Sequence, residues 1–275
     1  MKFRLTLVLL WLLAGVNPVA GQTDIPVDFV EQLSTGSINW TSGSVTASGI
    51  GLVDSAIRNV LETAFQVRMN ADCRVIDLTR PNVNLQIEVE EMASAAEIIG
   101  QKTLPDGRTE MTVKMELFGG FAQLLLPTDI KQVESIKPLS QAQEMPTKGI
   151  GASAGHRSGA EPDTYTGLIV DARGIGAKPA MVPVLLDENG KEVYSSAFVS
   201  REYAVQQGVC LYMRILGDSA NLTRVAPKPL WVKGLRTRTA ASCDIVISNA
   251  DASRLRGASS HLSFLKQCRV IILMD

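Results

Sequence analysis

The chain has 275 residues, of which 45% are hydrophobic, 20% charged and 5% aromatic, and its formal net charge is -1. This length suits one large or two small globular domains. The near-neutral charge gives no indication of binding to nucleic acid or to an anionic membrane, and the scarcity of aromatic rings argues mildly against a surface for stacking bases or sugars.

Residues 1–21 have the organisation of a bacterial export signal. A short basic start is followed by an apolar run from Leu5 to Val16, and small residues lead up to Gly21. The run is about a dozen residues long, shorter than the ~20 that span a bilayer. The first cysteine of the chain is Cys73, so no residue for lipid attachment stands at the cleavage point. We expect cleavage near Gly21 and a periplasmic or secreted protein without a direct lipid anchor.

Residues 34–127 form the first predicted domain. The segment from Ile38 to Gly51 is typical of a strand with small polar residues on one side. Asp54 is placed to cap a helix that runs to about Ala71, and apolar residues recur in that helix at helical spacing. A single apolar stripe of this kind needs a sheet to cover it.

Two further strands are predicted in the same domain. Residues 83–90 and 111–117 both alternate apolar and polar side chains, as half-buried strands do. On this interpretation the glutamates near position 90 line a solvated strand face. Pro105-Asp106-Gly107 lies between the two segments and is a turn of the kind that closes hairpins. The first domain is therefore predicted as a helix packed on a small antiparallel sheet.

Residues 128–162 differ from their surroundings in composition. Proline, glutamine, glycine, alanine and serine dominate, and apolar side chains are too few to order the segment. We predict a flexible linker that lets two domains bind partners separately.

Residues 163–275 form the second predicted domain. It opens with a strand from Thr166 to Asp171. Residues 182–186 and 192–194 flank a loop that ends in Asn-Gly, which is a strong hairpin signal.

The end of the chain carries the clearest pattern. Residues 244–247 and 269–273 are apolar at successive positions, as buried parallel strands are. Between them, residues 249–251 offer caps for a helix over about 252–264. This order predicts a right-handed βαβ unit that ends a mixed sheet. The whole chain is predicted to have an α+β fold of two small domains.

The cysteines and histidines give no strong sign of a metal or catalytic site. Cys73, Cys210, Cys243 and Cys268 match no zinc spacing and allow three disulfide pairings. Cys243 and Cys268 each open a short strand, so their sulfurs lie close if those strands are neighbours. We favour buried free thiols that behave as small apolar residues over any one specific bridge.

His156 lies in the predicted linker, and His261 lies near the end of a helix expected at the surface. No Gly-x-Ser-x-Gly surrounds a serine, so no serine hydrolase site is predicted. The sequence therefore indicates no catalytic residue, no cofactor and no metal site.

The segment after the strand 166–171 is the candidate interaction loop. Asp171, Arg173 and Lys178 are its charged residues, and Asp171 suits a cation or a substrate amine. Gly174 and Gly176 lack the third glycine of a nucleotide-binding fingerprint. The alternative, which we favour, is structural: Asp171 pairs with Arg173 or the loop backbone, while the glycines supply positive-φ turns.

A set of segments in the first domain resembles a known family. The segments AIRNVLE (56–62), QVRMNADCRVID (66–77) and LPDGRTEMTVKMEL (104–117) occur in an order similar to that of the LPP-twenty family of secreted lipoproteins. The related N-terminal domain of flagellar assembly protein T shares this order. The resemblance spans roughly residues 37–120. The second domain resembles the rear half of uncharacterised secreted proteins that carry such a first domain.

The resemblance implies a non-enzymatic protein of the cell envelope. Relatives of the first domain assemble into disks or rings around the flagellar motor, or sit on the outer membrane. We therefore expect a structural or assembly component that contacts envelope proteins or itself, and association with the flagellum is one form of this expectation. The alternative is a periplasmic module that binds a small ligand or cation through the loop from Asp171 to Lys178.

Overall fold

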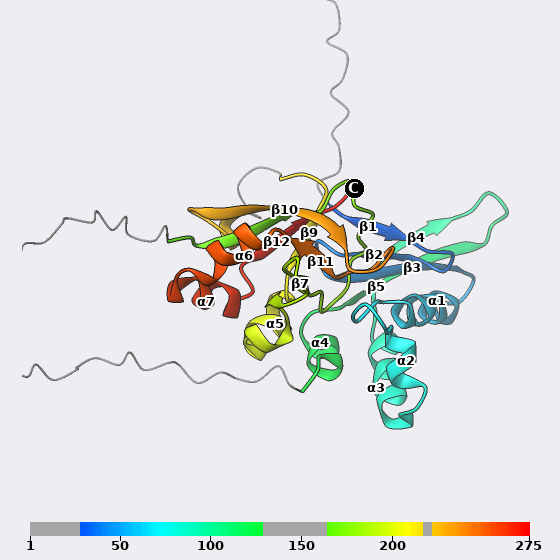
Figure 1. The fold of residues 1–275 in the computed structure, drawn as a ribbon. Coiled ribbons are helices and arrows are strands. Elements are labelled where there is room, and N and C mark those ends of the chain that lie inside the picture. Colours follow the sequence, from blue (N-terminus) through cyan, green and yellow to red (C-terminus); the bar gives the residue numbers. More distant parts are fainter. Residues whose placement is uncertain (1–27, 129–163, 217–221) are drawn as a thin grey trace, which may run out of the picture.

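The computed structural model of the chain describes residues 28–128, 164–216 and 222–275 (Figure 1). These residues form two β-sheets, one antiparallel and one mixed, together with seven α-helices, so the fold belongs to the predicted α+β class. The predicted export signal at 1–21, His156 and all of the predicted linker except Thr128 lie outside the described residues. Within the described ranges, no helix is both long and apolar enough to cross a membrane.

The first half of the described chain, residues 28–128, forms a five-stranded antiparallel sheet in the order β1-β2-β3-β5-β4. Its strands are β1 (Val30–Gln32), β2 (Ser37–Asn39), β3 (Ser44–Ile50), β4 (Glu97–Thr103) and β5 (Thr109–Glu116). Helix α1 (Val53–Phe65) packs on β3 and β5 and buries Val60 and Ala64. The predicted helix on an antiparallel sheet is thus confirmed, because the apolar stripe of the helix is covered by the sheet.

Two boundaries in this half differ from prediction. The strand predicted from Ile38 to Gly51 is divided into β2 and β3 by a tight turn, in which Gly43 has a φ of 68°. Helix α1 ends at Phe65, well short of Ala71, and the residue before it, Leu52, makes no side-chain cap hydrogen bond. Asp54 lies in the first turn instead, where its negative charge stabilises the positive end of the helix dipole.

The strand predicted over residues 83–90 is wrong, because this segment is helix α3 (Val83–Ser94). Asn82 caps the helix: its side-chain oxygen accepts a hydrogen bond from the N–H of Leu85 at 3.2 Å. Apolar residues at every second position also place Leu85 and Val89 four apart, on one face of a helix. The alternation therefore fits both structures, and packing of Val89 into the core selects the helix.

The strand that pairs with β5 in the hairpin is β4, which follows α3. The predicted turn Pro105-Asp106-Gly107 does close this hairpin, with a φ of 82° at Gly107. The glutamates at 88, 90 and 91 lie on α3 rather than on a strand face. Two short helices complete this half, α2 (Val75–Thr79) and α4 (Gly120–Leu125).

The second half, residues 164–216 and 222–275, forms a seven-stranded mixed sheet in the order β8-β7-β11-β10-β6-β12-β9. Its strands are β6 (Gly167–Asp171), β7 (Leu185–Leu186), β8 (Glu192–Tyr194), β9 (Leu211–Met213), β10 (Pro229–Thr237), β11 (Ile245–Ile247) and β12 (Val270–Leu273). The opening strand and the β7–β8 hairpin are confirmed. Helices α6 (Asn249–Arg256) and α7 (Ser259–Lys266) lie on one side of this sheet, as does α5 (Arg201–Gln207) (Figure 1).

The predicted βαβ unit is wrong in direction and in adjacency. Strand β11 is antiparallel to β10, whereas β10, β6 and β12 are mutually parallel, so β11 and β12 run in opposite directions. Two strands lie between them. The predicted single helix is also two helices, and Ser248 caps the first of them. Both strands are central in the sheet, and burial on both faces makes each apolar whatever its direction.

The two halves share an extensive interface. Asp28, just before β1, forms an antiparallel bridge with Met213 of β9. The rings of Trp40 and Tyr212 meet edge to face, with centroids 5.9 Å apart. Arg201 donates to three backbone carbonyls at the C-terminal end of α4. Together with a hydrophobic core that spans both sheets, these contacts join the two halves.

Candidate functional site

The candidate loop begins at Asp171, the last residue of the interior strand β6. The carboxylate of Asp171 accepts hydrogen bonds from the Arg173 guanidinium, at 2.8 Å from Nε and 3.2 Å from Nη2. It also accepts one from Nζ of Lys233 at 3.2 Å. Lys233 reaches it because β10 and β6 are parallel and place the two residues in register. The Arg173 hydrogen bond is the main cause that holds the pKa of Asp171 well below its usual value.

The rest of the loop is organised by backbone geometry. Gly174 and Gly176 have φ values of 81° and 65°, which only glycine adopts readily. The N–H of Gly174 donates to both carboxylate oxygens of Asp275 at 2.9 Å. Lys178 donates its backbone N–H to Ser242, while its side chain is exposed. The loop is thus held by contacts of Arg173 with Asp171, of Gly174 with Asp275 and of Lys178 with Ser242.

The structure therefore brings Asp171 and Arg173 together, as the structural interpretation predicts. Sequence reasoning missed Lys233 and Asp275, which complete the cluster. Neither is near the loop in the chain, and only the register of parallel strands could have pointed to Lys233. Because two cations already occupy the carboxylate, Asp171 is poorly placed to receive a cationic ligand.

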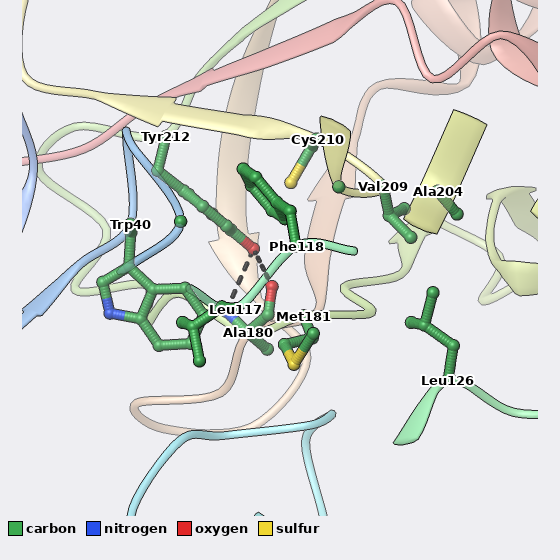
Figure 2. Close-up of a pocket in the computed structure, with 12 residues that line it drawn as sticks. Trp40, Leu117, Phe118, Leu126, Ala180, Met181, Ala204, Val209, Cys210 and Tyr212 are labelled. Atoms are coloured by element: carbon green, nitrogen blue, oxygen red, sulfur yellow. Dashed lines mark hydrogen bonds between the residues drawn. The ribbon is translucent and has the colours of Figure 1, made fainter. Parts of the chain in front are cut away.

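A narrow apolar cleft lies between the two halves (Figure 2). Its walls include Trp40, Leu117 and Phe118 from the first half and Met181, Cys210 and Tyr212 from the second. The space between them is about 20 Å³, room for about one water-sized molecule. This is too small for a metabolite.

Among the residues that line this cleft, Tyr212 carries the side-chain hydroxyl, and this group both accepts and donates a hydrogen bond. The Tyr212 hydroxyl accepts from the N–H of Ala180 at 3.0 Å and donates to its carbonyl at 2.9 Å (Figure 2). Burial raises the pKa of Tyr212 well above its usual value, so the hydroxyl stays neutral. Among the described residues, every buried side-chain nitrogen and oxygen has a hydrogen-bond partner. The cleft is therefore a joint between the halves rather than a binding site with groups that orient a ligand.

His261 differs from its predicted surface position. It lies in the first turn of α7 and is buried. Its Nε2 accepts a hydrogen bond from the backbone N–H of Tyr165 at 3.2 Å, and Nδ1 lies 3.1 Å from the carbonyls of Arg254 and Leu255. The ring thereby ties the start of β6 to both helices of the C-terminal segment, which is a structural role.

The four cysteines are free. Cys210, Cys243 and Cys268 are buried, and Cys73 is partly so. Burial raises the pKa of Cys210 to about 12 and that of Cys268 to about 11, so both remain unreactive thiols. Strands β11 and β12, which follow Cys243 and Cys268, are not neighbours, so the condition for a bridge between these two is not met.

No cluster of three or more His, Cys, Asp or Glu side chains suited to a metal ion occurs in the part of the chain that the structure describes. The charged groups of the candidate loop are likewise committed to one another. Among the sequence-predicted site residues, Lys178 contributes its backbone N–H, which donates to the carbonyl of Ser242, and its side chain is exposed.

Comparison with known proteins bears on the second half. No curated protein matches the chain. Residues 167–275 match a family described as the second domain of Treponema pallidum Tp0624. The matched residues cover less than half of the chain but include all seven strands of the mixed sheet. The second half of the protein is therefore similar to that domain.

Proposed function

We propose that this protein is a non-enzymatic structural or assembly component of the bacterial cell envelope that acts through contacts with envelope proteins or with itself. The proposal includes export to the periplasm or beyond. It also includes a kinship of the first half with LPP-twenty-like domains and with the N-terminal domain of flagellar assembly protein T. A flagellar location is one form of this role.

The observation that carries the proposal is the exposure of large apolar side chains on strands. Ile98 and Ile99 on β4 are 52% and 49% exposed. Trp231 and Leu235 on β10 are 51% and 47% exposed. Apolar side chains that share one strand and face solvent stabilise a complex when a partner covers them, so they favour protein contacts.

The alternative, a ligand-binding role for the candidate loop, has weaker support. The Asp171 carboxylate is engaged by Arg173 and Lys233, and Asp275 is engaged by Gly174. A ligand would have to displace these contacts before it gained its own.

The oligomeric state of the mature chain, residues 22–275, tests the proposal. We expect size-exclusion chromatography with light scattering to show a discrete oligomer whose population grows with protein concentration. A monomer at every concentration, with no envelope protein captured by cross-linking in cells, would overturn the proposal. A parallel thermal-shift screen with divalent cations and cell-wall fragments, with Asp171→Ala as control, tests the alternative.

A further inference from the structure

The edges of the two sheets differ in how they are closed. Strand β9 at the end of the mixed sheet is bridged by Asp28, which precedes edge strand β1 of the other sheet. Strand β8 at the opposite end of the mixed sheet has three residues, and the Arg256 guanidinium donates to the carbonyl of Glu192 at 3.1 Å. Both of these ends are thus blocked to a further strand.

Strand β4 is different. It has seven residues, and among the described strands it pairs only with β5. The β4–β5 hairpin extends away from the helices, so its outer edge is accessible (Figure 1). All its residues except Gly100 are exposed. An edge strand of this length presents a row of backbone N–H and C=O groups that can pair with another strand.

The side chains of β4 favour a partner strand. Proline, several lysines and bulges are common protections of natural edge strands, and β4 has no proline, one lysine, Lys102, and one bulge, at Ile99. A register shift between Ile98 and Gly100 leaves Ile99 as an extra residue against β5. Both isoleucines are about half exposed, so the edge strand presents apolar side chains to solvent.

We propose that β4 pairs antiparallel with β4 of a second copy of this chain, about a two-fold axis at Gly100. The two five-stranded sheets would then continue into one another. This inference rests on the proposed self-association and names the surface that performs it. A two-fold contact is closed, since the same strand is used by both copies.

Charge complementarity selects a second copy in this orientation. Glu97 lies at one end of β4 and Lys102 near the other. Antiparallel pairing centred on Gly100 brings Glu97 of each copy beside Lys102 and Thr103 of the other, and it does so twice because of the symmetry. Parallel pairing would instead place each charge beside its own kind. Glycine at the axis leaves the backbones free to approach.

The first experiment measures dimer dissociation of the mature chain by analytical ultracentrifugation. Glu97→Lys and Lys102→Glu are each expected to weaken the dimer about tenfold or more, since each places like charges together at two symmetric positions. The double variant restores opposite charges and is expected to return close to the wild-type constant. Leu52→Lys, at a residue that is 76% exposed beside α1, is the matched control and should change nothing.

The second experiment is cross-linking at the axis. A Cβ on Gly100 would meet only Thr112 at 3.5 Å, an ordinary contact, so Gly100→Cys is expected to fold. Opposed Cα atoms in an antiparallel pair are ~4.5–5.5 Å apart, within disulfide range. Oxidation should therefore yield a covalent dimer from Gly100→Cys, whereas Ser94→Cys and the wild type, which carries Cys73, should not.

The outcomes separate the two proposals. A wild-type chain that is strictly monomeric overturns both self-association and β4 pairing. An oligomer that is insensitive to the charge variants and gives no Gly100→Cys cross-link overturns β4 pairing alone. Circular dichroism of each variant shows whether a loss of dimer reflects unfolding, and rescue by the double variant excludes that explanation.

Discussion

Asp171 is stabilised by two cations from different parts of the chain. Arg173 is its neighbour in the loop, and Lys233 is its partner in register on β10. The cations are largely exposed, with Arg173 at 45% and Lys233 at 56%, so solvent screens much of their attraction. The cluster therefore holds the loop in place with a modest gain in stability.

Asp171→Asn is expected to lower the free energy of unfolding by about 1 kcal/mol at pH 7. The pKa of Asp171 is depressed in the folded state, so the stabilisation is present above the ordinary value of 3.8 and is lost as pH falls below it. Urea unfolding of both proteins at several pH values measures the difference, which should shrink only below about pH 4.

Lys178→Gln provides the control for this loop. The Lys178 side chain is exposed, and its backbone N–H makes the contact with Ser242. We expect no change in stability from this substitution. A loss as large as that of Asp171→Asn would contradict the structural account of the cluster.

At the scale of elements, α3 shows how an ambiguous pattern is resolved. Its alternating apolar residues fit a strand, but Asn82 begins a helix and Val89 and Ala93 bury one helical face. The strand that pairs with β5 then comes from the next segment, β4. Because the sequence predicts α3 as a strand, the predicted hairpin partner of β5 is also wrong.

Asn82→Ala is expected to destabilise the protein by about 1 kcal/mol, because it removes the side-chain acceptor of the Leu85 N–H. Asn84→Ala, at an exposed position within α3, should be neutral or slightly stabilising, since alanine is the better helix former. Thermal unfolding followed by circular dichroism measures both. Equal effects of the two variants would contradict the cap.

At the scale of the whole molecule, the two sheets are joined by direct contacts and a shared hydrophobic core. The Asp28–Met213 bridge, the Trp40–Tyr212 contact and the Arg201 hydrogen bonds all cross between the halves. The cleft between them holds only about 20 Å³ of open space, so side chains of the two halves pack closely along it.

We expect the mature chain to unfold in a single transition. In the mature chain, Trp231→Phe leaves Trp40 as a fluorescent reporter of the interface between the halves, while circular dichroism reports the secondary structure of both. Coincident urea transitions are expected, because unfolding of one half exposes the interface of the other. Arg201→Gln should move both transitions together to lower urea, by about 1–3 kcal/mol in free energy. Two separated transitions would show independent domains.

Local patterns predicted the parts of this fold that depend on neighbouring residues. The Asn189-Gly190 and Pro105-Gly107 turns close hairpins as expected, and β6, β12 and α1 occur where their apolar patterns place them. The α+β class follows from these elements. The pairing of Asp171 with Arg173 was also accessible, since the two residues are two positions apart.

The sequence by itself determined which segments are apolar, where the tight turns lie and which charged loop follows β6. Only the tertiary structure decided that β11 and β12 run in opposite directions, that Lys233 reaches Asp171 and that β4 is left as a free edge. The physical reason is that burial leaves the same apolar pattern on a strand whichever neighbour it has. Direction, register and free edges depend on contacts between residues far apart in the chain.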